Sequence, residues 1–167
     1  MRRQRSILIA LLTLSLAAFL GGCSENSPTA PVPTQTQNRV VSTDGALELS
    51  LSTERASYTE GQSIPITFSV RNTGSQSTTY RFNSTKQHDI RADEDDATVW
   101  RWAHGRSFGR AITSITLKPG ESRTWTEIWD QTSDAGDEVE TGTYELVGVL
   151  PASGGSIESD PLEVRIR

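Results

Sequence analysis

From residue 46 onward, short runs alternate between apolar and polar side chains, and this pattern limits the fold more than any other feature of the 167-residue chain. In the first run, Leu47, Leu49 and Leu51 alternate with Glu48 and Ser50. Successive side chains of a strand point to opposite faces, so this spacing predicts a strand with one buried face. Comparable runs predict strands around residues 64–70, 80–82, 88–92, 99–102, 115–117, 121–130, 144–150 and 162–166.

Turn residues such as Lys118-Pro119-Gly120 separate these runs, and no helical periodicity competes with them. Eight or nine short strands with frequent turns are typical of an all-β fold, an immunoglobulin-like antiparallel β-sandwich. Pro65 lies inside the second run and has no backbone N–H to donate. We therefore expect that strand to begin after Pro65 or to lie at the edge of a sheet.

The first 22 residues have the three parts of a secretory signal. Arg2, Arg3 and Arg5 form a positive start, residues 7–20 form an uncharged apolar run, and two glycines follow. A membrane-spanning helix needs about 20 apolar residues, so this run is short for a span. The pattern predicts a signal peptide over residues 1–22 that is cleaved after export.

The segment Leu20-Gly21-Gly22-Cys23 resembles a bacterial lipobox. The resemblance implies that the thiol of Cys23 receives a diacylglyceryl group and that the new amine is acylated, for example with palmitate. Two or more acyl chains anchor a protein stably in a membrane. We therefore expect a lipoprotein of the cell envelope, and Ser24 after the cysteine favours the outer membrane if the host has two membranes.

Residues 23–45 are expected to form a flexible tether after the lipidated cysteine. They are rich in Pro, Ser, Thr and Gln and contain little apolar surface to offset the entropy of ordering. The β-sandwich domain is then expected over residues 46–167. Because Cys23 is the only cysteine, the mature chain has no internal disulfide.

The charge of the chain excludes one class of partner. Removal of the leader leaves 13 basic and 21 acidic residues, a formal net charge of −8. Nucleic-acid binding requires a basic face, so we expect no nucleic-acid partner.

The sequence holds few candidate catalytic residues. The only histidines are His88 and His104, there is no Gly-x-Ser-x-Gly motif, and the single thiol is assigned to lipid. Each histidine is expected to be a plain surface or turn residue, not a catalyst. The acidic runs at residues 93–96 and 130–140 lack a recognisable spacing of metal ligands, so solvated turns are favoured over calcium sites. We expect no enzyme activity, no small-molecule substrate, no cofactor and no metal.

A family resemblance extends over about residues 47–166. Its motifs, in chain order, are Tyr58-Thr59-Glu60-Gly61-Gln62-Ser63-Ile64, Val70-Arg71-Asn72-Thr73, Gln87-His88-Asp89-Ile90, Val99-Trp100-Arg101-Trp102, Phe108, Leu117-Lys118-Pro119-Gly120-Glu121-Ser122, Trp129 and Gly142-Thr143-Tyr144. In this order they resemble the BsuPI-type intracellular proteinase inhibitor family. His88 departs from the family pattern, in which an aromatic residue such as tyrosine is expected.

The resemblance implies an immunoglobulin-like sandwich that binds a protease, since the founding inhibitor acts on a bacterial serine protease inside the cell. The expected function is a membrane-anchored lipoprotein with a protein-binding, proteinase-inhibitor-like domain. Its expected partners are the membrane, through the lipid on Cys23, and a protease or another envelope protein. The alternative is a structural or adhesive envelope module with no protease target.

The loop at residues 103–110 is the candidate partner-binding site. It holds His104, Arg106, Phe108 and Arg110 between predicted strands, and its basic charge contrasts with an acidic domain. Arginine and aromatic residues are favoured at the centres of protein interfaces. A protease could bind Arg106 or Arg110 as a substrate-like side chain, whereas Phe108 is expected to pack on the core.

The four tryptophans allow a second interpretation. Trp100 and Trp102 share one face of a predicted strand, and together with Trp129 they are expected to form core. A sugar-binding surface would instead require two or more tryptophans exposed on one face.

Overall fold

The computed structural model describes residues 37–167, so the signal segment, Cys23 and most of the expected tether lie outside the described residues. No helix in the described part of the chain is long and apolar enough to cross a membrane. The described residues form twelve strands: β1 (Asn38–Asp44), β2 (Leu47–Thr53), β3 (Ser57–Tyr58), β4 (Ile64–Asn72), β5 (Thr78–Phe82), β6 (Asp89–Glu94), β7 (Ala97–Arg101), β8 (Thr113–Leu117), β9 (Ser122–Trp129), β10 (Gly142–Ala152), β11 (Gly155–Glu158) and β12 (Leu162–Ile166).

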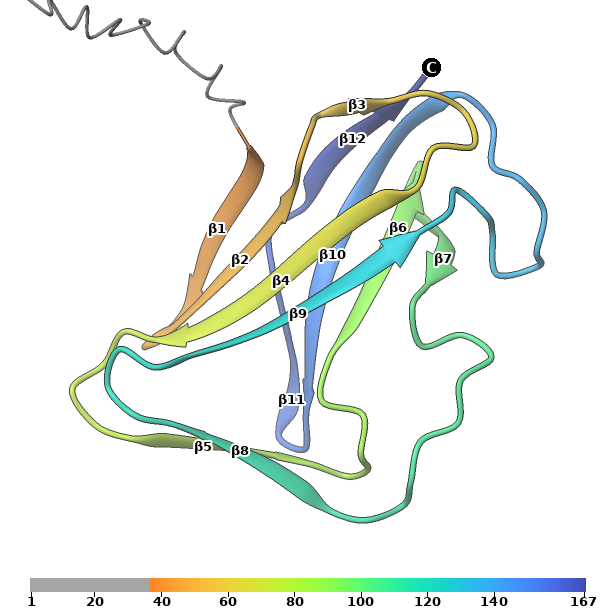
Figure 1. Cartoon of the computed structure of the whole chain (residues 1–167). Helices are drawn as coiled ribbons and strands as arrows, with labels where there is room; N and C mark the ends of the chain where they lie inside the picture. The colour runs from red at the N-terminus through yellow and green to blue at the C-terminus, as the bar shows by residue number, and fades with distance from the viewer. Residues whose placement is uncertain (1–36) are drawn as a thin grey trace, which may run out of the picture. The chain divides into compact units, whose positions relative to one another are not determined.

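These strands form two large sheets and one small sheet (Figure 1). The first sheet has the order β1-β2-β4-β9, and the second has the order β3-β12-β10-β6-β7, with β11 paired to β10. Strands β5 and β8 pair separately. All pairs are antiparallel except the short pair of β12 and β3. This arrangement confirms the predicted all-β, immunoglobulin-like sandwich.

All of the alternating runs form strands in the structure, but the first sheet begins earlier in the chain than predicted. The tether was predicted to extend to residue 45, whereas β1 pairs with β2 from Asn38 to Asp44. Only Val40 supplies a half-buried apolar side chain in β1, so alternation is weak there and the backbone ladder holds the strand. Strands β3 and β11 were also missed, because runs of two and four residues show almost no period.

The expectation for Pro65 was wrong. Strand β4 begins at Ile64 and lies between β2 and β9, not at an edge. The ladder between β2 and β4 ends at the pair Thr53–Ile66, one residue before Pro65 is reached. Pro65 therefore has a partner strand only on the β9 side, opposite Ile128, and the missing N–H is tolerated.

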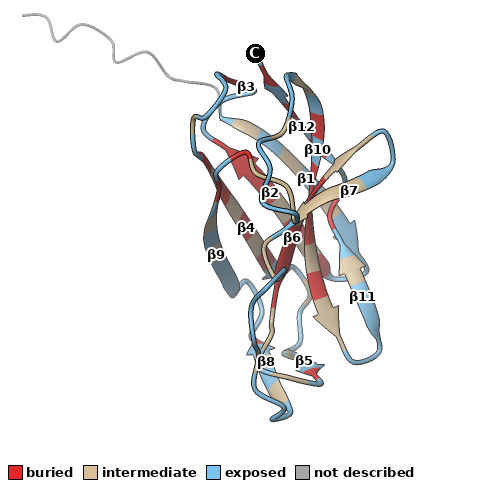
Figure 2. Ribbon diagram, turned by 90° about the vertical axis from the view of Figure 1, so that its right-hand side faces the viewer, coloured by how far each residue is buried: buried red, intermediate tan, exposed pale blue. Residues whose placement is uncertain are grey.

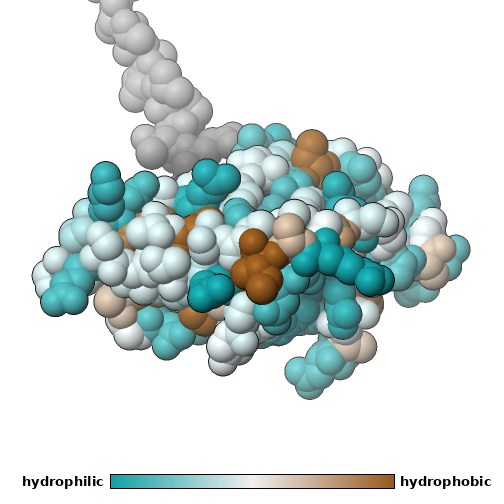
Figure 3. Space-filling view, turned by 90° about the horizontal axis from the view of Figure 1, so that it is seen from below, coloured by the Kyte–Doolittle hydropathy of each residue, from teal (hydrophilic) through white to brown (hydrophobic). Residues whose placement is uncertain are grey.

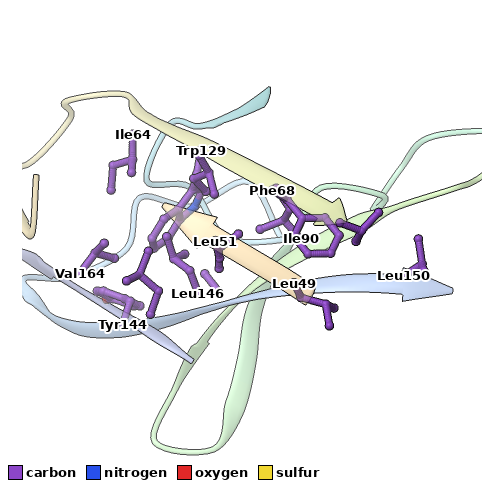
Figure 4. Packing of buried hydrophobic residues seen from close by; sticks show 14 of the residues in the cluster. Leu49, Leu51, Ile64, Phe68, Ile90, Trp129, Tyr144, Leu146, Leu150 and Val164 are labelled. Carbon is purple, nitrogen blue, oxygen red and sulfur yellow. The ribbon is translucent and has the colours of Figure 1, made fainter. Parts of the chain in front are cut away.

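The core lies between the inner faces of the two large sheets. Figure 2 shows buried residues along β2, β4, β6 and β10, and Figure 4 shows Trp129 among side chains from both sheets. Trp129 is fully buried and meets the ring of Tyr144 edge-on, with 5.3 Å between ring centroids. Burial of such large aromatic groups supplies much of the apolar area that stabilises a domain of this size.

Tyr144 fixes the start of β10 as well as the core. Its hydroxyl donates a hydrogen bond to the carbonyl oxygen of Glu140, four residues earlier, at 2.8 Å. This contact is a tyrosine corner, a feature of immunoglobulin-like sandwiches. Burial, together with the nearby carboxylates of Glu94 and Glu140, raises the pKa of Tyr144 to about 12.

Two of the quoted sequence motifs meet at Asn72, at the end of β4. The side-chain amide of Asn72 donates to the carbonyl oxygens of Gln76 and Leu117 at 2.7 and 2.9 Å, and its own backbone N–H donates to Glu121 at 3.0 Å. The backbone N–H of Gly120 donates to the carbonyl oxygen of Asn72 at 2.8 Å. This buried asparagine thus joins the end of β4 to the turn between β8 and β9.

Few large hydrophobic side chains remain exposed, and they are scattered over the domain. Val41, Ile112 and Ile128 are the exposed large hydrophobic residues of the described chain. The face seen in Figure 3 carries its hydrophobic residues singly, among hydrophilic ones. Isolated apolar residues are normal on a protein surface and do not by themselves mark an interface.

Candidate functional site

The connection between β7 and β8 carries every predicted site residue of the described chain. It leaves the edge of the second sheet at Arg101 and runs down one side of the domain to β8 (Figure 1). A tight turn begins it, in which the N–H of His104 donates to Arg101 and the N–H of Arg106 donates to Ala103. Gly105 occupies the left-handed backbone region of this turn, with φ of +66°. We call residues 102–112 the β7–β8 loop.

A stack of aromatic rings supports the start of the β7–β8 loop. The ring of His88 lies between the indoles of Trp102 and Trp125, with centroid distances of 4.1 and 4.9 Å. Trp125 in turn stacks on Phe68 at 5.7 Å. The stack joins the first sheet, which contributes Phe68 and Trp125, to the start of the loop at Trp102. It therefore fills the side of the sandwich between β9 and β6.

His88 was expected to be a plain surface or turn residue, and this expectation was wrong. It directly precedes β6 and only 6% of its surface is exposed. The two flanking indoles explain the burial, because a planar ring fits between them. His88 thus occupies a place that suits a planar side chain.

Glu127 on β9 is the polar partner of His88. Its Oε1 lies 2.8 Å from Nε2 of His88. Burial disfavours the charged imidazolium and lowers the pKa of His88, although the hydrogen bond and charge of Glu127 and the charge of Asp89 act in the opposite direction. The guanidinium of Arg106 also contributes to the lowering. The imidazole is therefore held in its neutral form over a wider pH range than an exposed histidine.

The middle of the loop is packed against the domain. The guanidinium of Arg106 lies over the ring of Trp102 at 4.6 Å, and its Nε donates to the carbonyl oxygen of Trp102 at 2.8 Å. Phe108 is half-buried and packs against Trp102, with 5.7 Å between centroids. Thr85 and Gly109 exchange hydrogen bonds through the N–H of Thr85 and the N–H of Gly109. These contacts fix the backbone on both sides of Phe108.

The remaining predicted residues reach solvent. Arg110 is exposed and makes no hydrogen bond or ion pair with any other described residue. His104 is also exposed, and its Nδ1 lies 3.3 Å from Oδ2 of Asp134 in the loop after β9. Arg106 is exposed as well but contacts Trp102, whereas Arg110 has no hydrogen-bond or ion-pair partner among the described residues.

The tryptophans do not form a sugar-binding platform. Trp129 is buried, Trp100 stacks on it at 5.8 Å, and Trp102 and Trp125 enclose His88. None of the four is exposed. The carbohydrate interpretation therefore loses its basis, while the expected role of Trp129 in the core is confirmed.

The residues that support the β7–β8 loop were not predicted from the sequence. Glu127 and Trp125 were predicted only to lie in a strand, and no partner was predicted for His88. The available signal was the alternation in residues 121–130, which places Trp125, Glu127 and Trp129 on one face. Nothing in the sequence indicates that this face meets His88, which lies 39 residues from Glu127 along the chain.

The first acidic run covers the end of β6 and the turn that follows it, and the second run lies in a loop. Asp95 and Asp96 form the turn between β6 and β7 with positive φ values of 47° and 63°, a conformation that aspartate tolerates better than most residues. The second run lies between β9 and β10. Within residues 37–167, no group of three His, Cys, Asp or Glu side chains is placed to hold a metal ion.

No curated protein sequence matches the chain. Among solved structures, a β-glucosidase from Erythrobacter marinus matches 78% of this chain at 16% identity and a TM-score of 0.42, but the chain spans only 16% of the enzyme. The sporulation control protein Spo0M from Bacillus subtilis matches 74% of the chain at 20% identity and a TM-score of 0.46, and half of that protein is covered. A CARDB domain from Pyrococcus furiosus matches 78% of the chain at 11% identity and a TM-score of 0.41, with 89% of that domain covered.

A family model gives the identification. It matches residues 51–155, well over half of the chain, and contains β4 to β10 together with the β7–β8 loop. Its description is BsuPI, intracellular proteinase inhibitor. The matched region includes the motifs at residues 99–102 and 117–122 and the Gly142-Thr143-Tyr144 start of β10. The chain therefore belongs to the BsuPI family of intracellular proteinase inhibitors.

Proposed function

We propose that the protein is a membrane-anchored, proteinase-inhibitor-like binding domain whose β7–β8 loop contacts the protease. The observation that carries the proposal is the exposed, unpaired Arg110 on a loop whose neighbouring residues, Phe108 and Gly109, are fixed to the domain. Family membership supports a protease as the partner. Arg110 would enter the specificity pocket of a protease that cleaves after basic residues.

A fixed loop suits this task for an energetic reason. Ordering a flexible loop on binding costs about 0.5–1.5 kcal/mol for each side chain that is immobilised. In the β7–β8 loop, the stacking of Trp102 on His88 and the hydrogen bonds of Thr85 with Gly109 already order the backbone. Most of the free-energy cost of ordering the loop is therefore already offset in the unbound protein.

An inhibition assay tests the protease contact. The full-length protein, purified in detergent, is assayed against trypsin, chymotrypsin and subtilisin, together with its Arg110→Ala, Arg106→Ala and Arg165→Ala variants. We expect inhibition of trypsin that weakens at least tenfold in Arg110→Ala, since one interface arginine commonly contributes more than 1 kcal/mol. Arg165 lies on β12 and is exposed, so its variant should inhibit like the native protein.

A lack of inhibition would contradict the proposal. If the folded protein inhibits none of the three enzymes, the alternative of a structural or adhesive envelope module replaces the inhibitor proposal.

The anchor is the second part of the proposal. Its support is the lipobox-like Leu20-Gly21-Gly22-Cys23 after a charged start and an apolar run. The site would be the cell envelope, and the outer membrane in a host with two membranes. Metabolic labelling with radioactive palmitate should label the native protein and leave Cys23→Ala unlabelled. Equal labelling of both proteins would contradict lipidation at Cys23.

A further inference from the structure

A pocket lies beside the start of the β7–β8 loop. Its volume is about 370 Å³, and it opens between the start of the loop and the segment that follows β9. Trp100, Trp102 and Arg106 line it from one side, and Ile128 and Asp134 line it from the other. The volume lies within the range of about 300–1,000 Å³ that is typical of ligand pockets.

The lining of this pocket is mainly polar, and Ile128 is its most exposed apolar side chain. Trp100 and Trp102 also line the pocket and are half-buried. Ile128 is 57% exposed on a strand whose other outward-facing residues, Thr124 and Thr126, are polar. A partner that covers these side chains would remove apolar area from water, which favours binding.

The carboxylates of the pocket are already engaged. Oδ1 of Asp134 accepts the backbone N–H of Arg101 at 2.8 Å, and its Oδ2 faces His104. Oδ1 of Asp130 accepts the hydroxyl of Ser63 at 2.6 Å. The acidic groups of the lining therefore have partners inside the domain.

The guanidinium groups of the pocket have no such partners. Neither Arg101 nor Arg106 forms an ion pair with a carboxylate of the described residues, although the domain is acidic overall. Arg106 donates only its Nε, to a backbone oxygen, and the rest of its guanidinium stays available. Two cations without counter-charges beside the exposed Ile128 would complement a carboxylate that carries an apolar neighbour.

The backbone beside the pocket favours an extended partner. Strand β9 is the last strand of its sheet, and its eight residues pair only with β4 in the described structure. By contrast, the edge of β7 is partly covered, because the N–H of Asp134 donates to the carbonyl oxygen of Val99. A free edge can accept a strand from another chain, whose main chain supplies affinity while side-chain pockets supply specificity.

We propose that this pocket and the adjoining edge of β9 bind an extended segment of a partner protein that carries an acidic side chain next to an apolar one. The acidic group pairs with Arg101 and Arg106, and the apolar neighbour covers Ile128. The inference rests on the proposed function insofar as the same loop meets a protein partner. It adds the chemistry of the segment that is recognised.

Selection from a random nonapeptide phage library on the full-length protein tests this proposal. We expect enrichment of peptides with Asp or Glu beside an aromatic or branched apolar residue. The double variant Arg101→Ala/Arg106→Ala should lose this enrichment, and Ile128→Glu should lose it through like charge. The variant Arg71→Ala, which changes an exposed arginine of β4, is the matched control and should keep it.

A titration then measures affinity directly. The most enriched peptide and its version with glutamine in place of the acidic residue are titrated while tryptophan fluorescence is followed. We expect at least tenfold weaker binding of the glutamine peptide to the native protein, and equal, weak binding of both peptides to the double variant. Circular dichroism of each variant verifies that the fold is retained.

Several outcomes would overturn the proposal: no enrichment, enrichment of basic peptides, or acidic enrichment that survives in the double variant. The inhibition assay separates this result from the proposed function. Acidic enrichment without protease inhibition would keep the pocket and remove the protease as partner. Inhibition without acidic enrichment would keep the protease and remove the pocket.

Discussion

His88 shows how one polar residue can be accommodated between aromatic rings inside this fold. The imidazole has the planar shape that the gap between Trp102 and Trp125 requires, while Glu127 satisfies Nε2. Histidine also brings a titratable group into this part of the domain, and burial lowers its pKa. The stability of the domain should therefore depend on pH through this residue.

The sign of that dependence follows from the lowered pKa of His88. The unfolded chain takes up the proton at a higher pH than the folded one, so the contribution of His88 is complete above about pH 6.5 and is lost as the pH falls through the folded-state pKa. Urea unfolding between pH 7.5 and 5 should show this loss in the native protein and a smaller loss in His88→Phe. The control is Ser107→Ala, at an exposed position of the β7–β8 loop without a titratable side chain, which should follow the native profile. A His88→Phe profile parallel to the native one would contradict the argument.

Gln131 is a second residue whose role appears only in the folded chain. Its buried amide donates to the carbonyl oxygens of Thr59 and Gln62 at 2.9 and 2.8 Å and accepts the N–H of Gly61 at 2.9 Å. We expect Gln131→Glu to lower the free energy of unfolding by about 2 kcal/mol or more, since the two carbonyls then face a group that cannot donate when ionised. Chemical denaturation measures the change. Gln76→Glu, at an exposed position, should leave stability within about 0.5 kcal/mol of native.

At the level of elements, the two large sheets are in tight contact where Gly148 of β10 faces Phe68 of β4. A Cβ atom on Gly148 would lie 2.3 Å from Cδ2 of Phe68, closer than two carbon atoms can pack. The glycine of β10 thus makes room for the aromatic ring of β4, and the same ring supports Trp125 below the β7–β8 loop. The contact between Gly148 and Phe68 therefore serves both the packing of the core and the support of the β7–β8 loop.

Gly148→Ala should therefore destabilise the domain by about 1–3 kcal/mol, the usual range for overpacking a core. Thermal unfolding followed by circular dichroism measures it. Gly154→Ala is the matched control, because a Cβ there meets nothing within 4 Å. Equal melting temperatures for the two variants would show that the core yields to the added methyl group.

The strands were predictable to different degrees, for physical reasons. Where one face of a strand is buried and the other solvated, as in residues 47–51 and 64–70, alternation records the burial directly in the sequence. In β1 the inward positions hold Asn38, Val40 and Ser42, so the strand is held mainly by hydrogen bonds of its backbone and of the Asn38 and Ser42 side chains, which give no apolar alternation in the sequence. The order of the strands depends on contacts between distant segments and could not be predicted at all.

The candidate loop was predictable in composition but not in structure. Its arginines and Phe108 stand out in an acidic sequence, whereas its supports come from β4, β9 and the residue before β6. Which arginine is free depends on where the carbonyl oxygen and ring of Trp102 lie, and that is a tertiary property.

For the molecule as a whole, β1 defines where the folded domain begins. Its seven residues pair with β2 throughout, and its removal would expose the edge of β2, which carries buried leucines. We expect a chain that starts at residue 46 to melt at a lower temperature than one that starts at residue 37, and to associate through the uncovered edge. Thermal unfolding and size-exclusion chromatography compare the two chains. Matching profiles would show that β1 is dispensable.

The start of β1 also limits how far the folded domain can lie from the lipid on Cys23. With Cys23 held in a bilayer, as we propose, the chain from Cys23 to Asn38 can extend at most about 50 Å, whereas a tether reaching residue 45 would have allowed about 75 Å. The domain would then search a thin layer next to the membrane instead of the surrounding volume. Targets confined to that layer would meet it at a high local concentration, and a modest intrinsic affinity would be enough to capture them.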